Sequence, residues 1–327
     1  MGKKVDEVKT VAFDPGFGGI KVYSTSGSTI LRSSVASNGA KRVAKVEGLK
    51  SARRPLMVET AAGSFYVGLG AHDAGRPVEN LDFDRLTGSP EMLALFLAVM
   101  AKHGVSGRTK LIVGLPVASL MGDGATETQK AVRGFLQGGH KWTVDGVSHE
   151  LEVESVAITS QPVGAMFDYL LTDDGMMTAD RKAIFKKELG ILGIGMNTVD
   201  LLVVRGGAPV QRFTAGETAG VRRLLELSNR DGLYSLSEMD EQLRKGLLDT
   251  TESMNVWRRE VMGVVEKTWS KNFARFERVI CVGGGAKLLR GALMDKFGQR
   301  IFVADDPVIS TARGLYKFTV MKDRKEN

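Results

Sequence analysis

Residues 13–21, with the sequence FDPGFGGIK, constrain the fold of this chain most strongly. The runs before and after it, residues 8–13 and 20–23, are short and rich in β-branched and aromatic side chains, so both favour strands. The glycines between them are Gly16, Gly18 and Gly19. Glycine tolerates positive φ and carries no Cβ, so backbone N–H groups can close on phosphate oxygens. The stretch therefore predicts a β-hairpin whose tip binds an anion.

Two charged residues flank these glycines. Asp14 offers a hard oxygen for a hydrated Mg²⁺, and Lys21 offers a point charge for a β- or γ-phosphate. The stretch is not a P-loop, because GxxxxGK[ST] is missing and a second strand replaces the helix that would follow it. A purely structural hairpin without a ligand, with Asp14 as a turn residue and Lys21 solvated, is equally consistent with this sequence.

Length and composition indicate a globular protein. With 327 residues, 43% hydrophobic and 25% charged, the chain has enough apolar sequence for two domains or one large one. Its single cysteine, Cys281, cannot form an intramolecular disulfide, which is typical of a reducing cytoplasm. We expect no membrane span, because no apolar run approaches the ~20 residues that a span needs, and the lysine-bearing N-terminus leads into a strand rather than a signal-peptide core.

The net charge of +7 and pI of about 9.4 favour contact with polyanions such as DNA, RNA or nucleotides. The basic residues are spread along the chain, with small clusters at 41–42, 53–54, 186–187 and 222–223. We interpret these clusters as solvated surface and do not expect direct, sequence-specific binding of nucleic acid. The four histidines have no metal-ligand spacing.

The first half of the chain predicts one mixed domain. Residues 24–80 indicate a small, irregular subdomain with short extended pieces at 55–58 and 64–68. Ser89, Pro90 and Gly104 delimit a buried helix over 92–103. The further expected elements are a buried strand at 109–116 ending in Gly-Leu-Pro, a helix at 126–136, a hairpin of 141–144 with 150–156, and a strand from 158 that passes into a helix reaching about 171.

The second half repeats the opening pattern. Residues 189–200, LGILGIGMNTVD, again predict a glycine-interrupted hairpin, which suggests internal duplication with a ligand held between the halves. Helices are expected at 220–228, 237–245, 256–273 and 288–297, with a strand at 276–282, an edge strand at 301–304, a helix at 307–320 and a frayed tail at 322–327. The triple glycine at 283–285 lets a flat ring approach the backbone, although a tight strand-to-helix turn explains it equally well.

In this order, these pieces resemble the actin superfamily. The matching motifs are DPGFGGIK at 14–21, SQPVGA at 160–165, GIGMNTVD at 193–200, VICVGGGAKLL at 279–289 and ISTARGL at 309–315. The resemblance implies an α/β, actin-like ATPase fold, in which two duplicated RNase H-like domains flank a nucleotide cleft. The implied domains are residues 1–172 with a small subdomain at about 32–80, residues 173–306, and a C-terminal helix at 307–327 that returns to the first domain.

Within the superfamily the chain looks most similar to prokaryotic actin-like proteins of the ParM and archaeal-actin type. The similarity lies in its size, the compact region from Arg32 to Asn80, the Gly-Leu-Pro strand end and the connection at 161–164. That family forms filaments on binding ATP or GTP, and many members move plasmid DNA through a separate DNA-binding adaptor. The resemblance thus implies a cytoplasmic, nucleotide-dependent filament protein with slow hydrolysis, whose partners are further copies of itself and such an adaptor.

The resemblance also implies roles for single residues. Asp14 would hold Mg²⁺ mostly through water, Lys21 would neutralise charge on the phosphates, and Gln161 would orient the attacking water. The remaining nucleotide-binding positions would be Gly16, Phe17, Gly18, Gly19, Gly195, Met196, Asn197, Thr198, Gly283, Gly284 and Gly285, with Glu217 on a ribose hydroxyl.

One position departs from the family pattern. The second phosphate loop of the family usually begins with an aspartate near the metal and the attacking water, and here that position is Gly193. Asp200 remains for part of the metal shell. The loss bears on hydrolysis more than on binding, because the cradle needs N–H groups and not that carboxylate. Our hypothesis is normal nucleotide binding with slow turnover, or a rearranged metal site.

Two other functions stay open from the sequence. A nonpolymerising kinase or regulator of the same fold would use a small-molecule phosphoacceptor and would show no assembly. A pseudo-enzyme scaffold would bind partners and no nucleotide.

Overall fold

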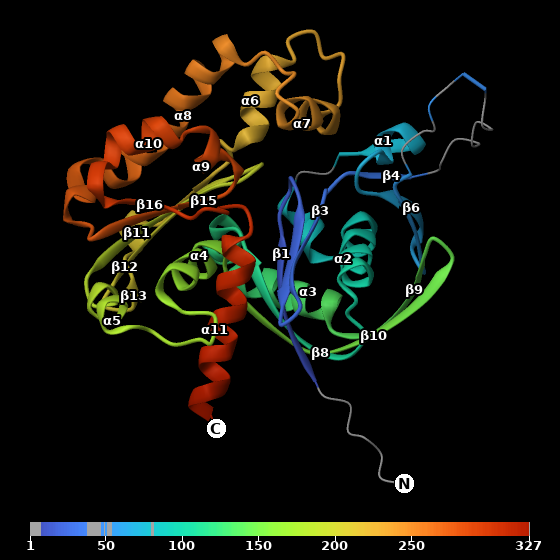
Figure 1. The fold of residues 1–327 in the computed structure, drawn as a ribbon, viewed down its shortest axis with the longest axis horizontal. Helices are drawn as coiled ribbons and strands as arrows, with labels where there is room; N and C mark the ends of the chain where they lie inside the picture. The colour runs from blue at the N-terminus through green and yellow to red at the C-terminus, as the bar shows by residue number, and fades with distance from the viewer. Residues whose placement is uncertain (1–7, 38–46, 49, 51–53, 80–81, 327) are drawn as a thin grey trace.

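Two β-sheets organise the computed structural model, which describes residues 8–37, 47–48, 50, 54–79 and 82–326 (Figure 1). The first is a ten-stranded sheet in which β1 pairs antiparallel with β2 and parallel with β8. Its strands in spatial order are β3 (Gly27–Leu31), β2 (Ile20–Ser24), β1 (Lys9–Pro15), β8 (Gly107–Leu115), β10 (Val147–Ser160), β9 (Gly138–Val144), β5 (Leu56–Thr60), β6 (Gly63–Val67), β4 (Val35–Ser37) and β7 (Arg76–Val78).

The second sheet has six strands and repeats the start of the first. β11 pairs antiparallel with β12 and parallel with β15, as β1 does with β2 and β8. Its strands are β13 (Ala208–Pro209), β12 (Val199–Arg205), β11 (Glu188–Ile194), β15 (Arg278–Val282) and β16 (Ile301–Val303), with β14 (Ala215–Glu217) paired to β12. The predicted duplication and α/β fold class are confirmed.

Helices cover the sheets with their apolar faces. In α2 (Pro90–His103), Ser89 Oγ accepts a hydrogen bond from the Met92 amide, and Gly104 ends the helix with φ of 74°. In α8 (Thr251–Trp269), Trp257, Val261, Val265 and Trp269 recur every four residues and are all buried. The other helices of the sheets are α3 (Ala125–Leu136), α6 (Val221–Ser228), α7 (Leu236–Arg244), α9 (Gly284–Leu288) and α10 (Arg290–Phe297), with short α1 (Ala71–Ala74) and α5 (Ala179–Phe185).

Short 3-10 turns complete the element order. They are η1 (Phe83–Thr87), η2 (Val117–Leu120), η3 (Gln211–Phe213), η4 (Ser270–Arg275) and η5 (Gly298–Arg300).

Two helices, α4 (Gln161–Leu170) and α11 (Ser310–Glu326), cross between the sheets and pack against each other. α4 contacts strands of both sheets, whereas α11 lies along β1, β2 and β8 (Figure 1). They approach so closely that a Cβ on Gly314 would lie 1.8 Å from the carbonyl oxygen of Gly164. The packed pair of helices therefore connects the two sheets.

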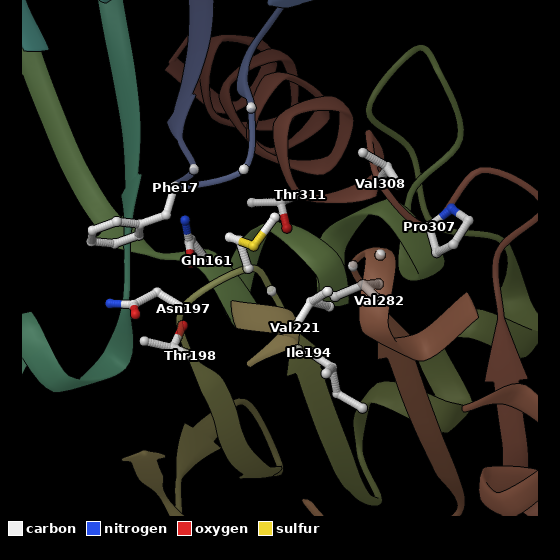
Figure 2. Close-up of a pocket in the computed structure, with 18 of the residues that line it drawn as sticks. Phe17, Gln161, Ile194, Asn197, Thr198, Val221, Val282, Pro307, Val308 and Thr311 are labelled. Carbon is white, nitrogen blue, oxygen red and sulfur yellow. The ribbon is translucent and has the colours of Figure 1, made fainter. Parts of the chain in front are cut away.

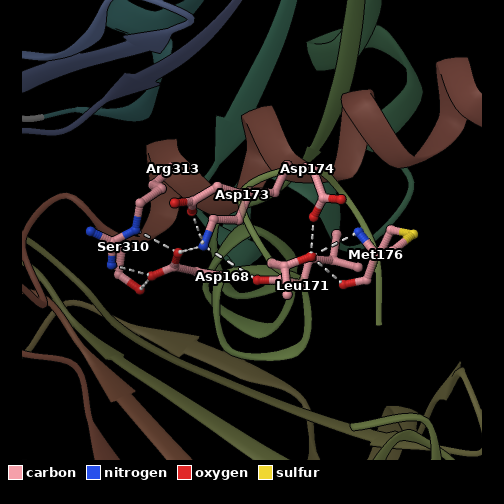
Figure 3. A network of polar contacts seen from close by, with 9 residues as sticks. Asp168, Leu171, Asp173, Asp174, Met176, Ser310 and Arg313 are labelled. Atoms are coloured by element: carbon pink, nitrogen blue, oxygen red, sulfur yellow. Dashed lines mark hydrogen bonds and ion pairs between the residues drawn. The ribbon is translucent and has the colours of Figure 1, made fainter. Parts of the chain in front are cut away.

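A buried polar network fixes this crossing (Figure 3). Asp168 of α4 accepts two hydrogen bonds of 2.6 Å from the Arg313 guanidinium and one of 2.6 Å from Ser310 Oγ. Lys317 Nζ lies 3.2 Å from the same carboxylate and 3.0 Å from that of Asp173. Only 4% of the Asp168 side chain is exposed, so these partners are what make its burial tolerable.

Three sequence predictions need correction. The described parts of residues 24–80 are more regular than expected: the two extended pieces are present as β5 and β6, and β3, β4, β7 and α1 accompany them. Residues 38–46, 49, 51–53 and 80 lie outside the described part. The helix expected at 288–297 is present as α10, but a separate short helix, α9, precedes it, since Gly283, with φ of 92°, turns the chain directly from β15 into α9. The tail expected to fray continues α11 to Glu326, with Arg324 paired to Asp174 at 3.6 Å.

Candidate functional site

The tips of the two duplicated hairpins meet at one cavity between the sheets. The cavity has a volume of about 400 Å³ and is also lined by residues of α4, α7, α9 and α11. The close-up shows Phe17, Gln161 and Thr198 around it, although they come from distant parts of the chain (Figure 2). A cavity of this size is in the range that small-molecule ligands occupy.

The first hairpin brings three polar side chains together. Asp14 and Lys21 face each other across β1 and β2, and Lys21 Nζ lies 3.1 Å from Asp14 Oδ2. Gln161, the first residue of α4, donates from Nε2 to Asp14 Oδ1 over 2.7 Å. Asp14 is only 2% exposed, and Lys21 and Gln161 stabilise its buried carboxylate at the cavity wall.

The tip of this hairpin has bare backbone. Among the backbone hydrogen bonds of turns and loops in the described part of the chain, none is donated by the amides of Phe17, Gly18 and Gly19. A Cβ on Gly16 would lie 2.5 Å from Lys21 Nζ and 2.7 Å from the Gly19 carbonyl oxygen. The loop thus has donors for an anion and, at Gly16, no space for a side chain.

The second hairpin is held by the start of α6. The amides of Gly220, Val221 and Arg222 donate to the carbonyl oxygens of Asn197, Gly195 and Met196, respectively. These three carbonyl oxygens therefore have hydrogen-bond partners within the protein. Met196 also touches Gly18, because a Cβ on Gly18 would lie 3.0 Å from the Met196 side chain. The two tips are therefore in direct contact.

Asp200 anchors this hairpin to the other sheet. Its Oδ1 accepts from the Val117 amide at 2.8 Å, just after β8, and its Oδ2 accepts from Thr198 Oγ1 at 2.6 Å. Burial raises the pKa of Asp200 to about 6, and the two hydrogen bonds oppose that rise. Both carboxylate oxygens of Asp200 thus have protein partners, and they connect the second hairpin to the end of β8. The contribution of Asp200 to a metal shell stays a prediction.

Gly193 lies opposite Asp200 in the hairpin register, and it also lines the cavity. A Cβ there would find Asp200 Cβ at 3.7 Å and Val282 Cγ2 at 3.9 Å, which are ordinary contacts. The missing aspartate of the family pattern therefore does not reflect a lack of space at the Cβ position.

The structure accounts for the three glycines at 283–285 in two ways, by the close packing of α9 on the β11 hairpin and by bare backbone at the cavity wall. Cβ atoms on Gly283 and Gly285 would lie 2.3 Å and 2.1 Å from atoms of Ile194, so these glycines allow α9 to pack on the β11 hairpin. Gly283 and Gly284 line the cavity, and nothing lies within 4 Å of a Cβ on Gly284. The structure does not place Gly285 among the cavity-lining residues, because Ile194 covers it.

Glu217 also lies away from the cavity. Its carboxylate pairs with Lys267 Nζ at 3.0 Å, and it is not among the described residues that line the wall. The geometry therefore gives no support to its predicted contact with a ribose hydroxyl.

Sequence reasoning missed the wall formed by α7 and by the start of α11. Asp240 and Arg244 of α7 line the cavity, as do Lys287 of α9 and Thr311 of α11. The capping box of Ser235 and Glu238 marks where α7 begins. No local pattern indicates which face of α7 meets the other sheet.

The donor set fits a nucleotide with a hydrated metal ion. Across the described ranges, no group of three or more His, Cys, Asp or Glu side chains could hold a metal by itself. Mg²⁺ commonly keeps several waters and binds one or two carboxylates plus substrate phosphates, and Asp14 provides such a carboxylate. When bound, the ion would neutralise charge on the phosphate oxygens.

Comparison with known proteins finds a family match for the first half of the chain and the same fold for the whole chain. Residues 12–164 match the family model described as "Actin like proteins N terminal domain". The apo psk41 ParM protein superposes with a TM-score of 0.71 at 17% identity, covering 98% of this chain and 99% of that chain. Ta0583, an archaeal actin homolog in complex with ADP, gives 0.72 at 16% identity, covering 98% and 100%. A 15-stranded ParM filament from Clostridium botulinum gives 0.75 at 15% identity, covering 95% and 99%.

The chain thus has the actin-like fold, and its residues 12–164 match the N-terminal domain family of actin-like proteins, the family that the sequence motifs indicated. No curated protein matches its sequence. Among the described residues, no helix is long and apolar enough to span a membrane.

Proposed function

We propose that the protein binds ATP or GTP with Mg²⁺ in this cavity and assembles into filaments when the nucleotide is bound. The observation that carries the proposal is the convergence of both glycine hairpins, Asp14, Lys21 and Gln161 on one cavity between the sheets. Phosphoryl transfer needs mainly positioning and electrostatic stabilisation, and this set of groups is sufficient for both.

We propose the expected roles for the residues that line the cavity. The amides of residues 17–19 and of the second tip hold the phosphates, and Lys21 stabilises the charge that develops on them. Gln161 orients water through its amide oxygen, since its Nε2 is engaged by Asp14. An amide is a poor base, so the hydrolysis we propose is slow and times filament turnover.

Likeness to proteins seen as filaments supports self-assembly, and the ADP complex of an archaeal actin homolog supports nucleotide binding. We further propose cytoplasmic localisation, a DNA-binding adaptor as a second partner, and plasmid or other DNA segregation as the cellular role. The proposed domains are residues 1–172 and 173–306, with residues 307–327 returning to the first.

Right-angle light scattering of the purified protein with Mg²⁺ and ATP or GTP tests the proposal, with negative-stain imaging of the product. We expect a nucleotide-dependent rise above a critical protein concentration, with filaments on the grid. A flat trace despite nucleotide binding favours a nonpolymerising kinase or regulator. A flat trace without binding favours a scaffold.

A further inference from the structure

Cationic side chains gather at the end of the second sheet that lies away from the cavity. One end of β11 and one end of β15 reach the cavity, where Ile194 and Val282 line its wall. The far ends of these strands and of β12 are Glu188, Arg278 and Arg205, and β13 and α5 lie at the same end of the sheet (Figure 1). A strand of this length separates the two ends by roughly 20 Å.

The strand pairing places cations side by side at this far end. Arg205 pairs with Glu188, and Arg278 pairs with Leu189 on the other side of β11. Arg300 precedes β16 and lies beside Arg278, because β15 and β16 run parallel in that register. From β16 to β12 there are three strand spacings, so these cations extend over about 14 Å.

Two further arginines meet this group from the segments beside the sheet. Arg275 Nη2 and Arg205 Nη2 lie 2.8 Å and 3.0 Å from the same atom, Glu188 Oε1. The guanidinium carbons of Arg212 and Arg275 lie 4.5 Å and 5.6 Å from the ring centre of Phe213. The shared ring and the shared carboxylate hold these side chains together.

The group is completed by Lys187 and Arg181. Lys187 Nζ lies 2.9 Å from Glu277 Oε2. The hydrogen bond from Lys187 and the charges of Arg278 and Arg300 lower the pKa of Glu277. Burial and the nearby charge of Arg278 lower the pKa of Arg181. We call these seven cations the basic row: Arg181, Lys187, Arg205, Arg212, Arg275, Arg278 and Arg300.

The basic row carries more positive charge than its neighbours neutralise. Glu188 and Glu277 are the carboxylates that pair with its members, and the Glu188 side chain is only 11% exposed beneath its two arginines. Among the described residues, four members of the row form no ion pair: Arg181, Arg212, Arg278 and Arg300. The surface therefore attracts an anion with several charges.

The composition of the row favours phosphate groups. Six of its seven members are arginines, whose planar guanidinium can donate two parallel hydrogen bonds to one phosphate. A nucleic-acid strand presents a phosphate about every 3.4 Å along the helix axis, so about 14 Å of cations faces about four phosphates. An extended row thus matches an extended, evenly charged ligand.

The surroundings of the row disfavour a protein or a membrane as its ligand. None of the exposed large apolar side chains of the described residues lies in the segments that form the row. Protein interfaces have an apolar core, and membrane-surface binding needs apolar anchors.

The aromatic rings at the row do not offer a platform for bases. Arg181 and Arg212 lie over Tyr169 and Phe213, and both rings are buried. Bases of a single strand need free rings on which to stack, so contact is restricted to the phosphate backbone.

We infer that the basic row binds the phosphate backbone of double-stranded nucleic acid without sequence preference. This function goes beyond the proposed nucleotide site, because it gives the chain a direct contact with nucleic acid at the far end of the second sheet. It also changes the interpretation of the charge. Six of the seven cations lie outside the short basic clusters of the sequence, and only the fold brings them together.

Fluorescence anisotropy of a labelled DNA duplex of about 20 base pairs, titrated with nucleotide-free protein in EDTA between about 50 and 200 mM salt, tests the inference. We expect binding whose affinity falls steeply with salt, with a log–log slope of at least about 4 in magnitude, since phosphate contacts release counterions. Two duplexes of unlike sequence should bind equally. Absence of binding at the lowest salt, or strong preference for one sequence, would overturn the inference.

The triple variant Arg212→Gln/Arg278→Gln/Arg300→Gln locates the contact. These three arginines form no ion pair, so their replacement leaves no buried carboxylate without a partner. We expect the affinity to fall by at least about 30-fold at the lowest salt and the slope to decrease by about 3, because each lost contact retains about one counterion.

The matched control is Arg258→Gln/Arg259→Gln/Arg290→Gln. These exposed arginines of α8 and α10 also have no ion pair among the described residues, and their replacement changes the net charge equally. We expect a loss of about 3-fold or less, because only the long-range field changes. Equal losses in the two triple variants would show attraction by net charge alone and would overturn the inference.

Competition distinguishes nucleic acid from other polyanions. Unlabelled duplex should displace the labelled duplex, whereas polyglutamate or phosphatidylserine vesicles at the same charge concentration should not. Equal displacement by either would reject nucleic acid as the ligand. Because the assay contains neither nucleotide nor Mg²⁺, failure of the proposed function would leave its result unchanged. Conversely, if the nucleotide site is correct, the row variant should still bind mant-ATP or mant-GTP.

Discussion

Gln161 Nε2 donates to Asp14 Oδ1 over 2.7 Å, which joins the first residue of the crossing helix α4 to the end of β1. This contact leaves the amide oxygen of Gln161 as the atom that can accept a hydrogen bond from water. We expect Gln161→Ala to lower the rate of phosphate release by about 10- to 100-fold. Nucleotide affinity should change less, because the amides that we propose bind phosphate remain.

Gln137→Ala is the matched control, since Gln137 bonds the Glu154 carbonyl oxygen on the outside of the first sheet. A malachite-green assay of phosphate release with Mg²⁺ and saturating nucleotide makes the comparison. If the two alanine variants lose the same amount of activity, Gln161 does not orient the water.

Gly193→Asp restores the carboxylate that the family pattern has at this position. The site has room for a Cβ, with the nearest atom, Asp200 Cβ, at 3.7 Å. We expect phosphate release to rise about 10-fold, because an added carboxylate can orient both water and the metal shell. Gly193→Asn supplies nearly the same volume without the charge and should show no such gain. An unchanged rate in the aspartate variant would count against our explanation of slow turnover.

Asp200 gives the stability of the protein a defined dependence on pH. Its folded pKa of about 6 lies above the ordinary value of 3.8, so folding favours the protonated form. The unfavourable contribution of the ionised carboxylate is absent below pH 3.8, grows as pH rises toward 6 and is constant above that. The shift corresponds to about 3 kcal/mol at most.

We therefore expect Asp200→Asn to gain stability relative to wild type by about 1–3 kcal/mol more at pH 8 than at pH 4. Urea unfolding of nucleotide-free protein in EDTA at both pH values measures this. Asp231→Asn, on the exposed loop after α6, is the control and should show no such difference. A gain that does not vary with pH would show that Asp200 does not titrate in this range.

Asp168→Ala leaves Arg313 and Lys317 without the buried carboxylate that both contact. We expect a loss of about 3–5 kcal/mol in the free energy of unfolding, because two cations lose a desolvated partner. Glu150→Ala serves as the comparison, since its ion pair with Lys141 is exposed by 71% and 80% and should be worth under about 1 kcal/mol. Similar urea midpoints for both variants would exclude a structural role for the network.

Much of the site was predictable because its signals are local. The alternation of strand and glycine in residues 13–21 predicted the first hairpin, and the same pattern at 189–200 predicted the second. The helix caps at Ser89 and Gly104 gave correct ends for α2. Glu217, which is not among the described residues lining the cavity, pairs instead with Lys267, which lies 50 positions away and carries no signal of its own.

By itself, the sequence determined which segments become strands, turns and helices, and where bare backbone can receive a phosphate, because these depend on neighbouring residues and on glycine. Only the tertiary structure decided which residues meet across the cavity. Arg32 and Asp240 lie 208 positions apart, and Gly164 and Gly314 touch only once α4 and α11 have packed between the sheets. Such contacts arise from the summed burial of both cores, and no short window of residues encodes them.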